Sequence, residues 1–182
     1  TIPGLTWPTH TFHRRMTLWL GDRECQVIHA GRSHTAGDTA VWMPKEKVLF
    51  AGDIVEFGAT PYCGDAHFRD WSATLAVLQQ LGPERMVPGR GRALMTKADC
   101  AEAIEGTRAF TTDLFTRVQA GVAKGWDLKA IYDDTMGFMR PRYGHWVIFE
   151  HCMPFNVTRA HDEAMGLDHP RIWTAVRDVA LW

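Results

Sequence analysis

Residues 31–57 read GRSHTAGDTAVWMPKEKVLFAGDIVEF and contain two copies of one design, an apolar strand that ends in a polar loop. A strand predicted at 26–30 leads to His34, and a strand predicted at 48–51 leads to Asp53. Imidazole nitrogen and carboxylate oxygen both suit zinc and related ions. Each residue also fits an ordinary role, because loop histidines often form hydrogen bonds and Gly-Asp often forms a turn. The pattern as a whole predicts a pair of candidate metal ligands.

The combination H-T-A-G-D, a short hairpin and a second strand closing on G-D closely resembles the metallo-β-lactamase superfamily of hydrolases. In that family the histidine of H-T-x-G-D binds metal, and the aspartate of the later G-D bridges two metals. The resemblance therefore implies that His34 and Asp53 are metal ligands, with Asp53 also the catalytic residue. It implies that Thr35 and Asp38 support the His34 loop without binding the metal.

The composition is that of an ordinary globular protein. The chain has 182 residues, of which 46% are hydrophobic and 23% charged, and its formal net charge is −1. This length can bury the core of one domain, and the charge balance gives no support for binding nucleic acid or an anionic membrane. No signal peptide or membrane-spanning run is visible. Four cysteines without a C-x-x-C pair are typical of reduced thiols, so we expect a cytoplasmic location.

Strand and helix patterns extend in both directions from residues 31–57. A strand at 17–20 is expected to form a hairpin with the strand at 26–30, and another strand is expected at 39–43. Asp70 is a candidate N-cap for a helix that ends at Leu81.

The second half of the chain is predicted to be helical. A first helix follows Thr96, and Asp127 is expected to cap a second, which the segment 141–144 (PRYG) would break. Pro154 is expected to open a third helix, and a last one follows Pro170.

A third loop follows the strand predicted at 85–88 and reads GRGR. In the resembled family P-G-H-G at this place supplies the last metal ligand, and the matching residue here is Arg90. A guanidinium stays protonated and has no lone pair for a cation. Arg90 is therefore interpreted as a substrate-binding residue for an anionic group, or else as a turn residue. Because its charge repels a divalent ion, we expect it to turn away or to pair with Asp53 first and Asp65 second.

The family signature H-x-H-x-D-H, which lies upstream of H-T-x-G-D, is absent. The family fold is a four-layer αββα sandwich of two halves. The resemblance implies an α/β chain with the second half of that sandwich at 1–95, followed by a helical C-terminal region at 96–182 that packs on it. A lone half leaves a sheet face and edge unpaired. We therefore expect a truncated domain, covered by the missing N-terminal half, a cleaved piece or a second copy.

The resemblance implies a zinc-dependent hydrolase, with one or two metals in the full-length protein and a metal-activated water. The substrate is expected to be a small ester, lactone, thioester or lactam. Two alternatives stay open. The chain could be a catalytically inactive binding or regulatory remnant, which Arg90 and the absent signature favour. It could instead be a di-iron oxidoreductase of the same fold, which needs the full ligand set.

Overall fold

A five-stranded sheet with helices beside it forms the structure, a computed structural model that describes residue 4 and residues 6–181. The strands lie in the order in which they follow one another in the sequence. The first four pair antiparallel, and the fifth pairs parallel with the fourth after a helical crossover. Their bounds are β1 (Arg15–Leu20), β2 (Arg23–Ile28), β3 (Ala40–Met43), β4 (Val48–Gly52) and β5 (Arg85–Pro88).

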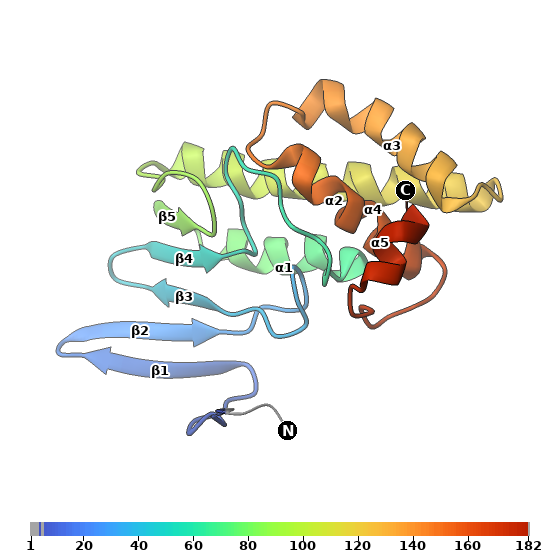
Figure 1. Cartoon of the computed structure of the whole chain (residues 1–182). Coiled ribbons are helices and arrows are strands. Elements are labelled where there is room, and N and C mark those ends of the chain that lie inside the picture. The colour runs from blue at the N-terminus through green and yellow to red at the C-terminus, as the bar shows by residue number, and fades with distance from the viewer. Residues whose placement is uncertain (1–3, 5, 182) are drawn as a thin grey trace.

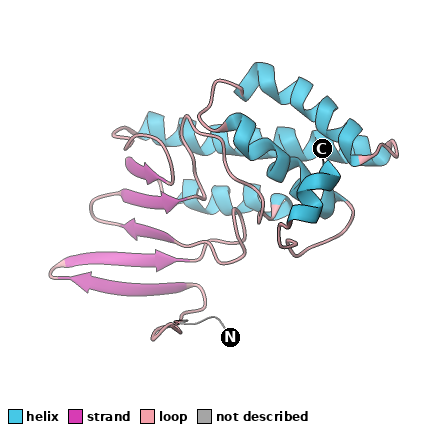
Figure 2. Ribbon diagram, in the orientation of Figure 1, coloured by secondary structure: helices cyan, strands magenta, loops and turns pink. Residues whose placement is uncertain are grey.

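Figures 1 and 2 show the strands at one end of the molecule and most of the helices at the other. The helices labelled α1 and α2 lie nearest the sheet and extend from it toward the end of the molecule where the other helices lie. The bounds of the helices are α1 (Phe68–Gln80), α2 (Lys97–Ala123), α3 (Leu128–Tyr143), α4 (Phe149–Ala164) and α5 (Ala175–Leu181). The prediction of an α/β chain with a helical second half is confirmed. Of the helices that the structure describes, none combines the length and apolar character that a bilayer-spanning segment requires.

One face of the sheet forms the core together with α1. Trp42, Leu49 and Met86 lie opposite one another on neighbouring strands and are all buried. Trp71 and Leu75 of α1 are fully buried in the same cluster. The core continues into the helical region, so both parts of the chain share one apolar interior. A division into two domains near residue 96 stays a prediction.

The opposite face of the sheet carries a second apolar row. The strand register places Met16, Val27, Val41, Phe50 and Val87 side by side across all five strands. Phe50 is 42% exposed and Val87 is 40% exposed. Within the described part of the chain, this face is therefore incompletely covered. We call these five residues the open row.

The start of α1 corrects the prediction for Asp70. The helix begins at Phe68, and its first two backbone amides, those of Phe68 and Arg69, donate to the two carboxylate oxygens of Glu163 at 3.0 and 2.9 Å. Asp70 lies in the first turn and pairs with Arg32 at 2.6 Å. A buried carboxylate from α4 therefore satisfies the amides that a local N-cap would otherwise satisfy.

The cap of α3 is as predicted, and α2 follows Thr96 as predicted, with Thr96 as its cap. Thr96 accepts a hydrogen bond from the Asp99 amide at 3.1 Å, and Asp127 accepts one from the Ala130 amide at 2.8 Å.

The prediction that Pro154 opens a helix was wrong, whereas α3 ends at Tyr143, within the segment 141–144 that was predicted to break it. Pro141 lies inside α3, and Pro154 lies inside α4, which begins at Phe149. An interior proline costs a helix about 3 kcal/mol. Burial offsets this cost in α4, because Phe149, Cys152 and Met153 are all buried.

Candidate functional site

Asp38 organises the loop that carries His34. Its carboxylate accepts hydrogen bonds from the Ser33 hydroxyl at 2.5 Å, the Thr35 amide at 2.9 Å and the Thr35 hydroxyl at 2.6 Å. Carboxylates that accept several local donors fix a loop in one conformation. Thr35 and Asp38 therefore support this loop, and Asp38 Oδ1 is 4.0 Å from His34 Nδ1.

The structure brings His34 and Asp53 together. His34 Nε2 lies 3.7 Å from Asp53 Oδ2, and the His34 side chain is only 14% exposed. The Nε2 atom itself is buried and has no hydrogen-bond partner among the residues that the structure describes. A buried polar atom without a partner costs free energy unless a ligand satisfies it. The two strand-end loops thus meet as their sequence pattern predicts, while metal binding by these residues stays a prediction.

Arg90 lies in the same place but pairs mainly with a residue that sequence reasoning missed. Its Nη1 atom donates to Glu56 Oε1 at 2.6 Å and lies 3.5 Å from Asp53 Oδ1. The predicted pairing with Asp53 forms as the longer contact, whereas no contact of Arg90 with Asp65 is found among the described residues. The Glu56 side chain is fully buried, and this burial raises the pKa of its carboxyl to about 7, against the opposing effect of Arg90.

Two glycines let the Arg90 loop approach the Asp53 turn closely. A Cβ atom on Gly89 would lie 2.2 Å from Asp53 Oδ1 and 2.8 Å from the backbone of Asp53. A Cβ atom on Gly91, whose φ is +101°, would lie 2.2 Å from the Phe57 carbonyl oxygen. The Phe57 amide donates to the Arg90 carbonyl at 3.2 Å. The sequence GRG is therefore required to hold the guanidinium against the two carboxylates.

Aromatic side chains flank His34. The ring centroids of Tyr62 and Trp71 each lie 6.3 Å from that of the His34 imidazole. The Tyr62 ring also packs against the ring of Phe155 in α4, with 5.4 Å between their centroids. Asn156 fixes the Tyr62 loop, because its side chain accepts from the Cys63 amide at 2.7 Å and donates to the Pro61 carbonyl at 2.9 Å. The helical region therefore shapes the surroundings of His34.

The residues of this chain do not by themselves fit a zinc site. Structural and catalytic zinc sites use three or four protein ligands. Among the residues that the structure describes, no group of three or more histidine, cysteine, aspartate or glutamate side chains could hold a metal ion. His34 and Asp53 supply two donors, and the third neighbouring group is the cationic Arg90.

Comparison with known proteins relates the part of the chain that contains the paired strand-end loops to a known superfamily. Residues 20–90 match the family model described as the metallo-beta-lactamase superfamily. This region belongs to that superfamily, and the five-stranded sheet with its helices is part of the superfamily fold.

Similar proteins share only part of their length with this chain. It is 34% identical over 77 residues to a metallo-beta-lactamase type 2 of Elizabethkingia meningoseptica, covering 41% of this chain and 31% of that protein. It is 26% identical over 98 residues to a metallo-beta-lactamase type 2 of Pseudomonas aeruginosa, covering 51% of this chain and 40% of that protein. The chain thus spans about a third of the length of these relatives. The crystal structure of metallo-beta-lactamase IND-7 matches with a TM-score of 0.51 at 23% identity, over 60% of this chain and 50% of that chain, which supports the fold alone.

Proposed function

We propose that this chain forms part of a zinc-dependent hydrolase, in which His34 and Asp53 supply two metal ligands and another segment supplies the rest. The observation that carries the proposal is the buried Nε2 of His34, which lies 3.7 Å from Asp53 Oδ2 and has no hydrogen-bond partner in the described part of the chain. Membership of residues 20–90 in a superfamily of hydrolases supports it. A small ester, lactone, thioester or lactam is the proposed substrate class.

The segment that completes the site is proposed to cover the open row. An apolar row across a whole sheet face, with Phe50 and Val87 each about two-fifths exposed, is a surface that association buries favourably. The proposed occupant is the other half of the superfamily fold, carried by the same protein, a cleaved piece or a separate chain. A second copy of this chain on the same face is the competing outcome.

Arg90 is proposed to bind an anionic group of the substrate. Its Nη1 atom is held by Glu56 and Asp53. Its Nε and Nη2 atoms make no hydrogen bond within the part of the chain that the structure describes, and the side chain is 39% exposed. A guanidinium fixed at one nitrogen presents its other N–H groups in a planar fork that suits a carboxylate.

Zinc content tests the proposal in the native assembly that contains this chain. We expect the native assembly to contain zinc and the His34→Ala and Asp53→Ala variants to lose it. The control variant His169→Ala, which changes an exposed histidine far along the chain, should leave the zinc content unchanged. Zinc that is absent from the native assembly, or unaffected by His34→Ala, would contradict the proposal. Iron in place of zinc would support the oxidoreductase alternative.

A non-catalytic binding protein is the second candidate. The close Arg90–Glu56 pair and the absence of a third donor among the described residues favour it. Under this alternative the native assembly holds no metal and turns over no substrate of the classes above. A cytoplasmic location is proposed for either function, supported by four buried cysteines that form no disulfide.

A further inference from the structure

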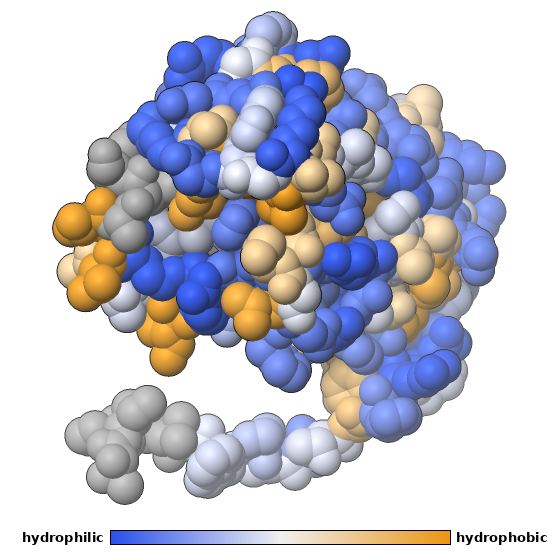
Figure 3. Space-filling view, turned by 90° about the vertical axis from the view of Figure 1, so that its right-hand side faces the viewer, coloured by the Kyte–Doolittle hydropathy of each residue, from blue (hydrophilic) through white to orange (hydrophobic). Residues whose placement is uncertain are grey.

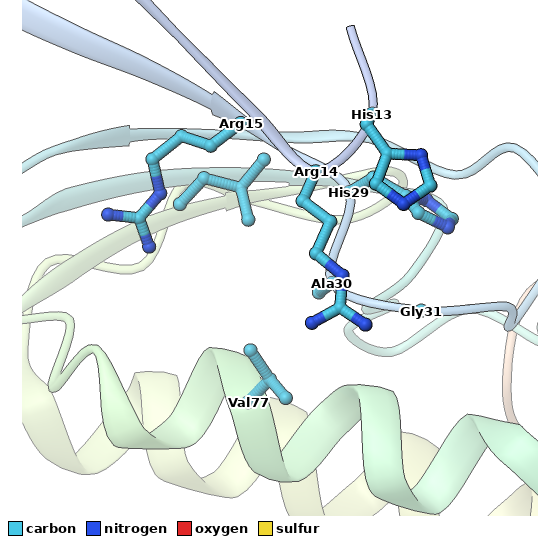
Figure 4. Close-up of a pocket in the computed structure, with 8 residues that line it drawn as sticks. His13, Arg14, Arg15, His29, Ala30, Gly31 and Val77 are labelled. Carbon is cyan, nitrogen blue, oxygen red and sulfur yellow. The ribbon is translucent and has the colours of Figure 1, made fainter.

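A groove distinct from the His34 site lies between the first hairpin and α1 (Figure 4). Its volume is about 460 Å³, within the range of small-molecule sites. Figure 4 shows the side chains of Arg14 and Arg15 extending from the strand toward the side where Val77 of α1 lies. The lining residues are His13, Arg14, Arg15, Ile28, His29, Ala30, Gly31 and Val77.

The backbone holds the two sides of the groove in place. The His29 amide donates to the Arg14 carbonyl at 2.9 Å, which extends the pairing of β1 with β2 by one step. Arg15 lies opposite Ile28 in the register, so both side chains point to the α1 side of the sheet. Gly31 passes so close to α1 that an added Cβ would lie 2.4 Å from Thr74 Oγ1. The groove is therefore built from regular, hydrogen-bonded elements.

The positive charges of Arg14 and Arg15 have no counterion among the described residues that line the groove. No carboxylate lines it, and Arg14 and Arg15 form no ion pair within the described part of the chain. Arg32, close by in the sequence, differs because it pairs with Asp70 and Asp168. His29 donates from Nδ1 to the Asp38 carbonyl at 2.9 Å, so it offers no negative charge either.

The remaining lining is apolar. Ile28, Ala30 and Val77 form that part of it, and Val77 is 39% exposed although it lies on the helix that covers the sheet. Two arginines at one side and an aliphatic surface at the other complement a molecule with an anionic head and an apolar body.

We propose that this groove binds a small organic anion, with a carboxylate or phosphate head on Arg14 and Arg15 and a short hydrocarbon body against Ile28, Ala30 and Val77. This site is separate from the proposed zinc site, so its test needs neither metal nor turnover.

Isothermal titration of the 182-residue chain with octanoate, octyl phosphate, octyl glucoside and inorganic phosphate tests the proposal. We expect octanoate and octyl phosphate to bind more tightly than inorganic phosphate, and octyl glucoside, which lacks the charge, to bind weakly. The double variant Arg14→Ala/Arg15→Ala should bind both anions at least about tenfold more weakly, as expected for the loss of charge-assisted hydrogen bonds. The control Arg23→Ala, at the other end of the same hairpin, should leave binding unchanged.

The variant Val77→Glu tests the apolar side of the groove and should weaken the binding of octanoate and octyl phosphate. Circular dichroism should show that its fold is unchanged. Equal binding of octanoate to the wild-type chain and to the double arginine variant overturns the proposal. Equal binding of octyl glucoside also overturns it, because the groove would then be a hydrophobic surface without anion recognition. Binding only to vesicles of anionic lipid, with no affinity for the soluble anions, would assign the patch to a membrane surface instead.

Discussion

Arg90 places a permanent positive charge 2.6 Å from Glu56 and 3.5 Å from Asp53. Glu56 is the more buried partner, and a buried carboxylate without a cation is costly. The position that serves as a metal ligand in the resembled family is therefore occupied here by a cation with its own buried counterion. This arrangement satisfies Glu56 Oε1 without any metal, whereas Oε2 has no partner in the described part of the chain.

The Glu56→Gln variant should change how stability depends on pH. The pKa of Glu56 is about 7 in the folded chain and 4.5 in its ordinary state, so the folded chain holds the proton more tightly. Its contribution to stability is complete below pH 4.5 and is lost as pH rises through about 7. Glutamine does not titrate, so the free energy of unfolding of Glu56→Gln should rise relative to wild type, by on the order of 2–3 kcal/mol, between pH 4.5 and 8.

Urea titrations at several pH values measure this difference. Glu102→Gln, an exposed position on α2, is the matched control and should run parallel to wild type at every pH. Parallel curves for Glu56→Gln as well would show that Glu56 is ionised throughout and that Arg90 outweighs its burial.

Gly89→Ala should destabilise the chain and displace the Arg90 loop. The added methyl would meet both the side chain and the backbone of Asp53 at 2.8 Å or less, and backbone cannot move aside cheaply. Overpacking of this kind costs about 1–3 kcal/mol. Gly137→Ala is the control, because a Cβ there meets nothing within 4 Å in α3 and should stabilise the helix by up to about 1 kcal/mol. Thermal unfolding of both variants measures the effects, and a neutral Gly89→Ala would show that the loop is loosely held.

The sequence predicts the meeting of His34 and Asp53 because each follows an apolar strand, and in a meander two strands separated by one antiparallel strand end at the same edge of the sheet. It does not predict Glu56, which lies three residues beyond Asp53 in a turn with no periodic pattern. One signal was present: an arginine in place of a ligand requires a carboxylate nearby. The choice among Asp53, Glu56 and Asp65 depends on the path of the turn, which only the tertiary structure determines.

At the scale of elements, the capping of α1 by Glu163 joins the two parts of the chain. Glu163 also accepts from Arg159 at 3.1 Å, and Arg159 donates in turn to the Ala66 carbonyl at 2.7 Å. Both side chains are almost fully buried. One carboxylate therefore fixes the start of α1, the loop before it and the orientation of α4.

Glu163→Ala should lower the free energy of unfolding by about 3–5 kcal/mol, because it removes one partner of a buried ion pair and leaves two helix amides unsatisfied. Glu150→Ala removes the partner of Arg140 in an exposed pair and should cost no more than about 1 kcal/mol. Urea unfolding of both variants measures the difference. Similar small losses in the two variants would mean that water replaces the Glu163 cap.

The strands and the caps of α2 and α3 are predictable because their signals are local. Alternation, turn residues and Thr96 or Asp127 before an apolar period all act within a few residues. The cap of α1 comes from 95 residues away, so the sequence near Asp70 cannot reveal it. Pro154 misleads for the same reason, since burial of α4 offsets a local penalty.

At the scale of the whole molecule, the sheet differs in its two faces. The Trp42 face is buried by α1, whereas the open row is incompletely covered in the described chain. The expectation of an unpaired sheet face came from the resemblance, and the register of the five strands now names its residues.

The open row makes a prediction about association. The chain by itself should self-associate through this face with rising concentration, because joining two such rows removes apolar surface from water. Val87→Asp should shift the equilibrium toward the monomer, since it places a charge in the open row, on the edge strand β5. Val77→Asp is the matched control: Val77 is 39% exposed and Val87 is 40% exposed, but Val77 lies on α1 at the other side of the sheet.

Sedimentation velocity over a range of concentrations distinguishes the outcomes. Loss of self-association in Val87→Asp but not in Val77→Asp places the contact on the open row. Equal loss in both variants would indicate association through general hydrophobicity. A wild-type chain that stays monomeric at every concentration would contradict the prediction, because partial burial of Met16, Val27 and Val41 would then suffice to keep this face in water.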